Sequence, residues 1–219
     1  MVMTEIYIGQ DMYYGVQNAK KSNTNNMKIF LTADLHLFDE DIAQARGFTD
    51  IKTYHQTIIR NWNNVVDQND NVYILGDISK SQDVQAVDFL NAWFNGYKIL
   101  VPGNHETMKL VNEFQKYHKH EVLFYPMLET KINDSIYYYI LSHIPLHPNE
   151  MDFYHANIHG HIHAPIPEMC YWPKEYPHPS DPNENGHAYY YNVNVEFQGF
   201  KPVDFDNIDR LIRLMPNKQ

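Results

Sequence analysis

Along the first half of the chain, short apolar runs alternate with longer stretches in which apolar residues recur at helical spacing. Short apolar runs bounded by polar or turn-forming residues are typical of buried strands, and apolar positions three and four residues apart are typical of amphipathic helices. The pattern predicts strands near residues 28–34, 72–75 and 97–101, and helices near 50–66 and 84–93. Because strand and helix alternate, we expect right-handed crossover connections and a largely parallel sheet.

The second half of the chain has more strand-like runs and predicts a second sheet. Asn133 and Asp134 separate two of these runs and predict a hairpin turn. From Pro165 to Pro182 the chain carries many prolines without a clear period, which predicts an irregular excursion over the surface. We therefore expect an α/β fold with two packed sheets flanked by helices. The expected elements are a helix near 106–118, strands near 121–125, 128–132, 136–142, up to Ile158 and near 189–197, and a closing helix capped by Asp206 or Asn207.

The composition is that of a globular protein with one main domain. The 219 residues are 43% hydrophobic, and the single cysteine excludes an internal disulfide framework. Residues 1–26 are polar and weakly patterned, so we expect an N-terminal arm followed by a domain over residues 27–219. No stretch has the pattern of a signal peptide or a membrane span, and we expect a cytoplasmic protein without a membrane partner.

The charge balance bears on possible partners. The chain has 17 basic and 27 acidic residues, which gives a formal net charge of −10. Such a surface does not attract polyanions over long range, so nucleic acid is not favoured as a partner. An enzyme that acts on phosphates is compatible with this charge, because bound cations can dominate the local field.

Polar residues suited to metal binding follow several of the expected strands. Asp34 and His36 close the first apolar run, and in an extended chain residues two apart project to the same side. Taken singly, each such residue is typical of a turn or of a packed histidine. Five such stretches follow successive strands, however, and one edge of a sheet could bring them together. The candidate ligands are Asp34, His36, Asp77, Asn104, His143, His161 and His163.

The mixture of ligand types narrows the chemistry. Sulfur is absent from the set, so a thiolate-bound structural zinc is excluded. Oxygen and imidazole ligands together suit Mn, Fe, Ni, Zn or Co better than Ca or Mg, and we expect Mn first. Two divalent ions roughly 3.5–4 Å apart can clamp a phosphoryl oxygen and lower the pKa of the water between them. Asp77 lies between the earlier and later candidates and is the natural residue to bridge both ions.

The histidines near residue 160 leave one alternative open. His159, His161 and His163 share the same alternation, so spacing alone allows any two of them to be ligands. Gly160 interrupts the strand pattern before His161 and weakly favours the later pair.

His105 differs from the candidate ligands. Its neighbour Asn104 is expected to face the metals, so the His105 side chain should point elsewhere, toward the substrate. There a protonated imidazole could stabilise developing charge or protonate the leaving oxygen, or the residue could only support its loop. Glu106 could orient a neighbouring residue or simply favour the start of a helix.

These motifs, taken in order, resemble those of the calcineurin-like metallophosphoesterases, and most closely those of small phage and bacterial phosphoesterases. The resemblance extends from about Met27 to the C-terminus. The stretches that carry it are Asp34-Leu35-His36, Gly76-Asp77, Gly103-Asn104-His105-Glu106, Ser142-His143 and Gly160-His161-Ile162-His163.

The resemblance implies a four-layer α/β/β/α sandwich and a phosphodiesterase or phosphomonoesterase that uses a hydroxide bridging two divalent metals. It implies His105 as the catalytic histidine beside the scissile phosphate of a small phosphoester. Its metal ligands would be Asp34, His36, Asp77 and His163 for the first ion, and Asp77, Asn104, His143 and His161 for the second.

The sequence departs from the motifs of this family at two places. Members of this group often continue the first motif with Phe-Gly-His, whereas Leu37-Phe38-Asp39 follows here. The Asp-Arg-Gly of serine/threonine protein phosphatases is also absent after Gly76. The alternatives to hydrolysis of a small phosphoester are a non-catalytic binding scaffold on the same fold and a nuclease. The sequence specifies neither the leaving group nor the oligomeric state.

Overall fold

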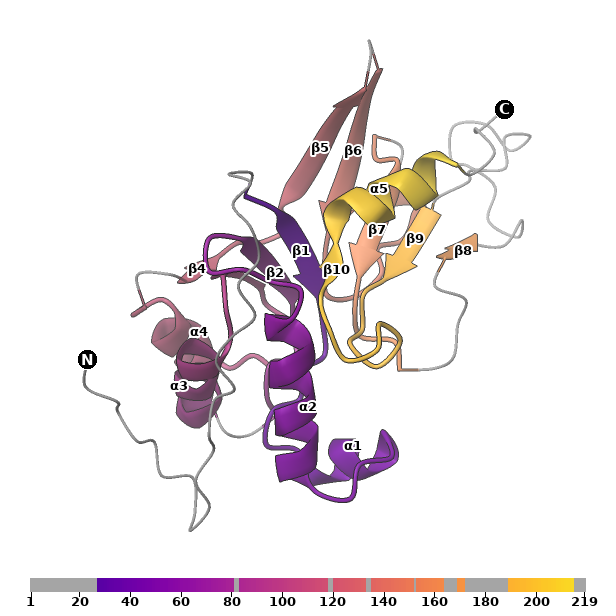
Figure 1. Ribbon diagram of the computed structural model, residues 1–219. Coiled ribbons are helices and arrows are strands. Elements are labelled where there is room, and N and C mark those ends of the chain that lie inside the picture. The colour runs from indigo at the N-terminus through magenta and orange to yellow at the C-terminus, as the bar shows by residue number, and fades with distance from the viewer. Residues whose placement is uncertain are drawn as a thin grey trace.

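The computed structural model describes residues 27–80, 83–117, 120–132, 135–151, 153–163, 169–171 and 189–214. Over these ranges the chain folds into two five-stranded sheets with helices around them (Figure 1). The predicted arm of residues 1–26, the turn at residues 133–134 and most of the 165–182 excursion lie outside the described residues. None of the helices in the described ranges combines the length and apolar character required to cross a bilayer.

The first sheet has the strand order β10-β1-β2-β3-β4. Its strands β1 to β4 are parallel, as the alternation of strands and helices predicted, and β10 is antiparallel to β1. Apolar side chains such as Val72 and Ile74 are fully buried on this sheet. The strands are β1 (Ile29–Thr32), β2 (Asn71–Leu75), β3 (Tyr97–Val101), β4 (His120–Val122) and β10 (Val203–Asp204).

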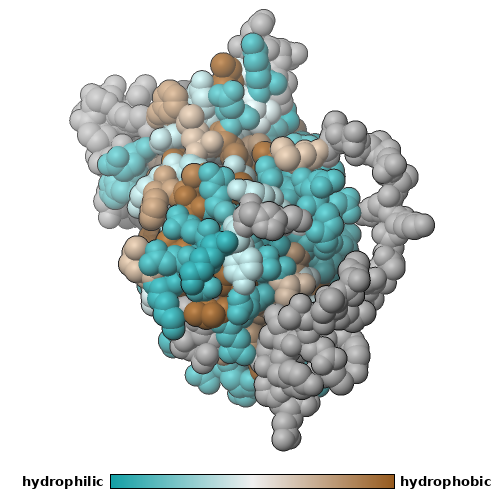
Figure 2. All heavy atoms as spheres, turned by 90° about the vertical axis from the view of Figure 1, so that its left-hand side faces the viewer, coloured by the Kyte–Doolittle hydropathy of each residue, from teal (hydrophilic) through white to brown (hydrophobic). Residues whose placement is uncertain are grey.

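The helices α2, α3 and α4 cover the outer face of the first sheet, where Trp62 and Phe89 lie in the largest core cluster, and α1 packs against α2 (Figure 1). Seen from the side of α3 and α4, the described surface is mostly hydrophilic, with hydrophobic residues scattered between (Figure 2). The apolar pattern did not predict α1, which forms because the Asp39 carboxylate accepts a hydrogen bond from the Ile42 N–H and caps the helix. The helices are α1 (Glu40–Ala45), α2 (Ile51–Asn63), α3 (Asp83–Trp93) and α4 (Met108–Phe114).

The second sheet has the strand order β5-β6-β7-β9-β8 and is mixed. β5 and β6 form an antiparallel pair that projects beyond the other strands, whereas β6, β7 and β9 are parallel (Figure 1). β8 pairs antiparallel with β9 and lies within the predicted excursion. The strands are β5 (Met127–Ile132), β6 (Ser135–Leu141), β7 (Ala156–His159), β8 (Met169–Tyr171) and β9 (Tyr189–Asn192).

A second apolar cluster lies between the sheets, and α5 (Phe205–Arg213) packs onto it through Phe205, Ile208 and Ile212. This helix starts two or three residues earlier than expected, because Asp204 caps it instead of Asp206 or Asn207. On the outer face of the second sheet, the short 3-10 helix η1 (Pro148–Glu150) precedes Met151, which packs on Tyr190. The predicted α/β fold of two mixed sheets with flanking helices is confirmed.

The carboxyl ends of the central strands of both sheets meet at one edge. The backbone N–H of Asp34 donates to the Gly76 carbonyl, and that of Gly160 donates to the His143 carbonyl. A bridge from Ala33 to Asn194 joins the two sheets. The loops that carry the candidate ligands are therefore held side by side.

Candidate metal centre

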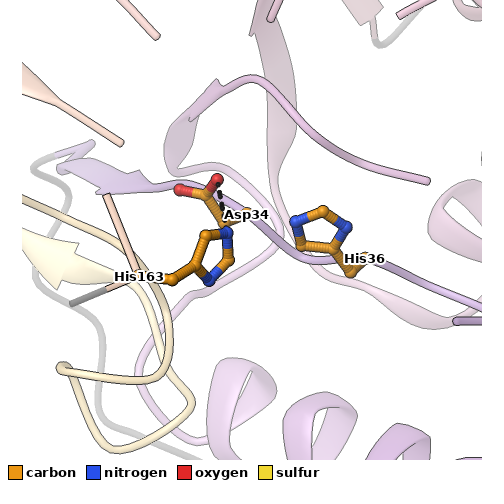
Figure 3. Close-up of side chains that lie close together, drawn as sticks. All are labelled: Asp34, His36 and His163. Carbon is orange, nitrogen blue, oxygen red and sulfur yellow. Dashed lines mark ion pairs between the residues drawn. The ribbon is translucent and has the colours of Figure 1, made fainter. Parts of the chain in front are cut away.

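Asp34, His36 and His163 form the first of two groups of donor side chains. One ligand atom from each residue lies within 4.8 Å of the others, and the three side chains converge in Figure 3. Nε2 of His163 lies 3.5 Å from Oδ1 of Asp34. Asp34 and His36 are buried, whereas 35% of the His163 side chain is exposed. The group therefore opens to solvent on the His163 side.

The backbone brings Asp34 and His36 together in a way that sequence reasoning did not anticipate. We expected an extended chain, but β1 ends at Thr32 and both residues have positive φ, 59° and 44°. Asp77 and His161 also have positive φ, at 54° and 68°. Such conformations are strained for residues with a side chain and persist where the surrounding structure holds them, often at functional sites. The strain is thus concentrated at the candidate centre.

Asp77, His143 and His161 form the second group, again with ligand atoms within 4.8 Å of one another. His143 Nδ1 lies 2.8 Å from the carbonyl oxygen of Leu75, which can only accept, so Nδ1 carries the proton. His143 Nε2 therefore presents a lone pair. It lies 2.8 Å from Oδ1 of Asn104 and 3.2 Å from Nδ1 of His161. Several nitrogen and oxygen atoms that can each offer a lone pair to a cation face one another here.

Asp77 lies between the two groups. Its Oδ1 is 3.4 Å from His143 Nε2, and its Oδ2 is 3.7 Å from His36 Nε2. Each carboxylate oxygen thus faces one group, which is the arrangement that a bridging ligand requires. Burial raises the pKa of Asp77, and the nearby Asp34 carboxylate adds to this effect against the opposing influence of His143 and His105.

Three glycines allow the loops to approach one another. A Cβ atom on Gly76 would lie 2.4 Å from Nδ1 of His143, and one on Gly160 would lie 2.5 Å from Oδ2 of Asp34. A Cβ on Gly103 would lie 2.7 Å from Oδ1 of Asp77. The Gly-Asp, Gly-Asn and Gly-His pairs in the sequence are therefore explained by close packing around the donors.

The donor set fits divalent cations. Oδ1 of Asp34 and both ring nitrogens of His36 are buried and have no hydrogen-bond partner among the described residues. Unpartnered polar atoms in a protein interior are costly, and a metal ion is one of the partners that relieves this cost. Burial lowers the pKa of His36 to about 4, with Arg46 contributing in the same direction, so its imidazole is neutral at pH 7 and can act as a ligand.

His105 and Glu106 follow Asn104 and have different environments. Nε2 of His105 lies 3.9 Å from Oδ2 of Asp77, and 35% of its side chain is exposed. Glu106 instead accepts hydrogen bonds from the backbone N–H groups of Asp77, Ile78 and Gly103, at 2.9, 2.8 and 2.6 Å. Of the two interpretations of Glu106, the structure favours a residue that positions its neighbours, because its carboxylate bonds two ligand-bearing loops to each other.

His159 lies outside both groups. It ends β7, its ring is buried near Tyr190, and its Nδ1 lies 2.8 Å from the Gly160 carbonyl oxygen. Burial lowers its pKa to about 4. The structure therefore brings His161 and His163 to the centre and places His159 in the second sheet.

Sequence reasoning missed Arg46 and Glu196 as residues of the centre. Glu196 Oε1 lies 3.2 Å from His163 Nδ1, and Glu196 Oε2 accepts a hydrogen bond from Arg46. The nearby carboxylates of Asp34 and Glu196 raise the pKa of His163 to about 9. Burial alone would raise the pKa of Glu196, but its bonds from His163 and Arg46 lower it. A buried Arg-Glu pair 150 residues apart leaves no signal in sequence spacing.

A cavity of about 240 Å³ opens above both groups. Besides His105 and five of the candidate ligands, its wall includes Asp39, Asp41 and Ile42 at α1 and Lys80 after β2. The five ligands are His36, Asp77, Asn104, His161 and His163. His105 and Lys80 therefore lie at the same cavity. The acidic residues on the α1 side give the cavity mixed charge.

Comparisons with known proteins agree with this geometry. A sequence model of the family described as calcineurin-like phosphoesterase matches residues 27–195. An uncharacterized protein of Methanocaldococcus jannaschii is 31% identical over 189 residues, covering 84% of this chain and 91% of the relative. The gene 66 protein of Mycobacterium phage L5 is 27% identical over 164 residues, covering 63% of this chain and 78% of the relative.

One solved structure shares the fold. A protein of unknown function from Aquifex aeolicus superimposes with a TM-score of 0.59 at 24% identity, covering 85% of this chain and all of that one. The family model and the Methanocaldococcus jannaschii relative confirm the resemblance to this family that the motifs suggested.

Proposed function

Because the chain belongs to the calcineurin-like phosphoesterase family, we propose that it hydrolyses small phosphoesters with two divalent cations bound at the candidate centre. The first cation would be held by Asp34, His36 and His163. The second would be held by His143, His161 and Asn104, with Asp77 bridging both. The observation that carries this proposal is the position of the two Asp77 oxygens, one facing each donor group.

The cations, when bound, supply positive charge for phosphoryl oxygens and activate water. The chain's own residues supply the rest of the chemistry. His105 lies at the cavity wall, partly exposed and beside Asp77, where its imidazole can donate a hydrogen bond to a phosphoryl or leaving-group oxygen. Lys80 in the same wall can pair with a negatively charged substrate group.

The metal we propose is manganese, with Fe, Ni, Zn and Co as the alternatives that the imidazole and oxygen donors allow. Purified protein loaded with Mn²⁺ is expected to hydrolyse bis-p-nitrophenyl phosphate or p-nitrophenyl phosphate. A panel with each of the five metals and both substrates would identify the preferred metal and separate diester from monoester hydrolysis.

Asp77→Asn is the variant that tests the proposal, because an amide cannot bridge two cations through two anionic oxygens. We expect it to lower kcat by at least about 100-fold, in line with loss of a metal-bridging group. Asp67→Asn, at an exposed position before β2, is the matched control and should retain full activity. Equal activity in both variants would refute the proposed centre. Protein without turnover on the panel and without bound Mn²⁺ would indicate a binding scaffold.

A further inference from the structure

Arg46 and Glu196 form a bonded pair behind the first donor group. Nε of Arg46 donates to Oε2 of Glu196 at 2.8 Å. The other two guanidinium nitrogens donate to the Asp34 backbone carbonyl at 2.8 Å and to the Tyr54 hydroxyl at 2.7 Å. Only 3% of the Arg46 side chain and 15% of the Glu196 side chain are exposed. Hydrogen bonds between such charged, largely buried groups are strong and well oriented.

Glu196 connects this pair to His163. One carboxylate oxygen of Glu196 is bonded to Arg46, and the other lies 3.2 Å from His163 Nδ1. A carboxylate only accepts hydrogen bonds, so Nδ1 carries a proton, and Nε2 is the nitrogen left to bind a cation. Asn194 borders the same ring, with its amide nitrogen 3.3 Å from Nδ1, and its side-chain oxygen accepts from the Glu196 backbone N–H. Nε2 of His163 then faces Oδ1 of Asp34.

We infer that Glu196 and Arg46 are positioning residues for the first cation. Glu196 orients the His163 ring and sets its tautomer. Arg46 holds Glu196 and the Asp34 loop in fixed positions relative to each other. This inference rests on the proposed function only in that it takes a cation to be bound by Asp34, His36 and His163. Carboxylates that accept a hydrogen bond from a metal-binding histidine commonly act in this way.

The second donor group has separate support. His143 is held by the Leu75 carbonyl. The Asp77 loop is held by Glu106. His161 is connected to the first group through the hydrogen bond from its backbone N–H to Oδ2 of Asp34, but that bond involves neither Arg46 nor Glu196. Loss of the Arg46–Glu196 pair should therefore weaken one cation and leave the other unchanged.

Titration of the metal-free full-length protein with Mn²⁺ in a calorimeter tests this inference. We expect two bound ions in the unmodified protein. In Glu196→Gln, the affinity for one ion should fall about 10- to 100-fold, which is the usual effect of removing such a partner, and the affinity for the other should not change. Arg46→Lys keeps the charge but loses the planar three-way donation, and it should weaken the same ion.

Glu113→Gln is the matched control. Glu113 is also a glutamate in an ion pair, with Lys116, and 17% of its side chain is exposed, but it lies on α4 away from the centre. This variant should bind both ions as the unmodified protein does. Unchanged affinity for both ions in Glu196→Gln, or equal weakening of both, would overturn the inference. If Glu196→Gln does not fold, Arg46→Lys gives the same discrimination between one ion and two.

A spectroscopic measurement separates positioning from general loosening. In protein loaded with Co²⁺, the visible absorption of only one of the two ions should change in Glu196→Gln, because only one set of ligands is reoriented. This readout is independent of turnover. Protein that binds two ions without hydrolysing any ester would refute the proposed function and leave the inference standing. An active enzyme whose Glu196→Gln variant binds both ions with unchanged affinity would support the proposed function and refute the inference.

Discussion

Oδ2 of Asp34 accepts a hydrogen bond from the backbone N–H of His161 at 2.9 Å, although the two residues lie 127 positions apart in the chain. The bond fixes the loop after β1 against the loop after β7. It also leaves the other Asp34 oxygen, Oδ1, without a hydrogen-bond partner and turned toward His163. One carboxylate thus joins two loops and still presents a free oxygen to a cation.

Gly160 makes this bond possible, so Gly160→Ala should damage the centre. The new Cβ would lie 2.4 Å from the Cβ of Ala33 and 2.5 Å from Oδ2 of Asp34, so the two loops would have to separate. We expect at least about a 10-fold loss of Mn²⁺ affinity, measured by calorimetry, because ligand geometry tolerates little displacement.

Gly199→Ala is the control for that substitution. Gly199 has φ of 64° and no atom within 4 Å of an added Cβ, so alanine there causes backbone strain without a clash. It should lower the free energy of unfolding by about 1 kcal/mol and leave Mn²⁺ affinity unchanged. Intact metal binding in Gly160→Ala would contradict the close packing described for these loops.

Asp77→Asn should have opposite effects on stability with and without metal. The pKa of Asp77 is raised by burial and by the Asp34 carboxylate, so the charged form is unfavourable in the folded protein. A group whose pKa is raised on folding opposes stability when it is ionised at neutral pH. The metal-free variant should therefore have a higher free energy of unfolding in urea than the unmodified protein.

Added Mn²⁺ should reverse this order. A ligand that binds only the folded state stabilises it by about 2.7 kcal/mol at 100 times its Kd. The unmodified protein should gain stability of this size at such a concentration, and Asp77→Asn should gain little. Equal stabilisation of both proteins by Mn²⁺ would place the cations elsewhere.

Acid should destabilise the metal-free protein through His55. This histidine is buried, its Nε2 accepts a hydrogen bond from the Phe38 N–H, and burial lowers its pKa to about 4. Between pH 6.5 and pH 4 the unfolded chain binds the proton more strongly, so stability is present at neutral pH and lost as the pH falls. The loss is on the order of 3 kcal/mol when complete.

Urea unfolding of the metal-free protein at several pH values measures this effect. His55→Gln keeps an acceptor for the Phe38 N–H but does not titrate, and it should reduce the loss of stability below pH 6.5. His147→Gln, at an exposed position, should leave the pH profile unchanged. A profile that is the same in all three proteins would show that His55 is not the group that titrates.

Glu106→Gln should weaken the centre without removing a ligand. The Glu106 carboxylate accepts three backbone N–H groups with its two oxygens, whereas an amide has one oxygen and a donor group that opposes an N–H. We expect kcat on bis-p-nitrophenyl phosphate to fall about 10- to 100-fold. Glu121→Gln, at an exposed position on β4, is the control. Unchanged kcat in Glu106→Gln would show that the Glu106 carboxylate only holds its loop and does not affect the centre.

The ends of the strands could be predicted from the sequence because burial imposes a simple pattern on them. The run Val72 to Leu75 is apolar and then stops at Gly76-Asp77, and the structure ends β2 at the same place. Since parallel strands of one sheet end at the same edge, Asn104 after β3 could be expected near Asp77 as well. The later histidines follow strands of the second sheet, so their place beside Asp77 depends on how the two sheets pack.

The details of the centre could not be predicted in the same way. Alternation of side chains in a strand suggested how Asp34 and His36 meet, but their positive φ depends on bonds to distant loops. Arg46 and Glu196 lie in segments whose local pattern shows only a helix end and a turn. Their contact exists because the sheets pack together, and no property of either segment alone determines it.

Each donor group takes side chains from both sheets: Asp34 and His36 with His163 in one, and Asp77 with His143 and His161 in the other. A bound cation would thus link the two sheets at the place where they meet. Loading with metal should slow amide hydrogen exchange in β1 and β7 together, although neither strand itself holds a ligand. The same cations would then occupy the candidate centre and link the two sheets. Loss of a cation would therefore weaken the contact between the sheets as well as the centre.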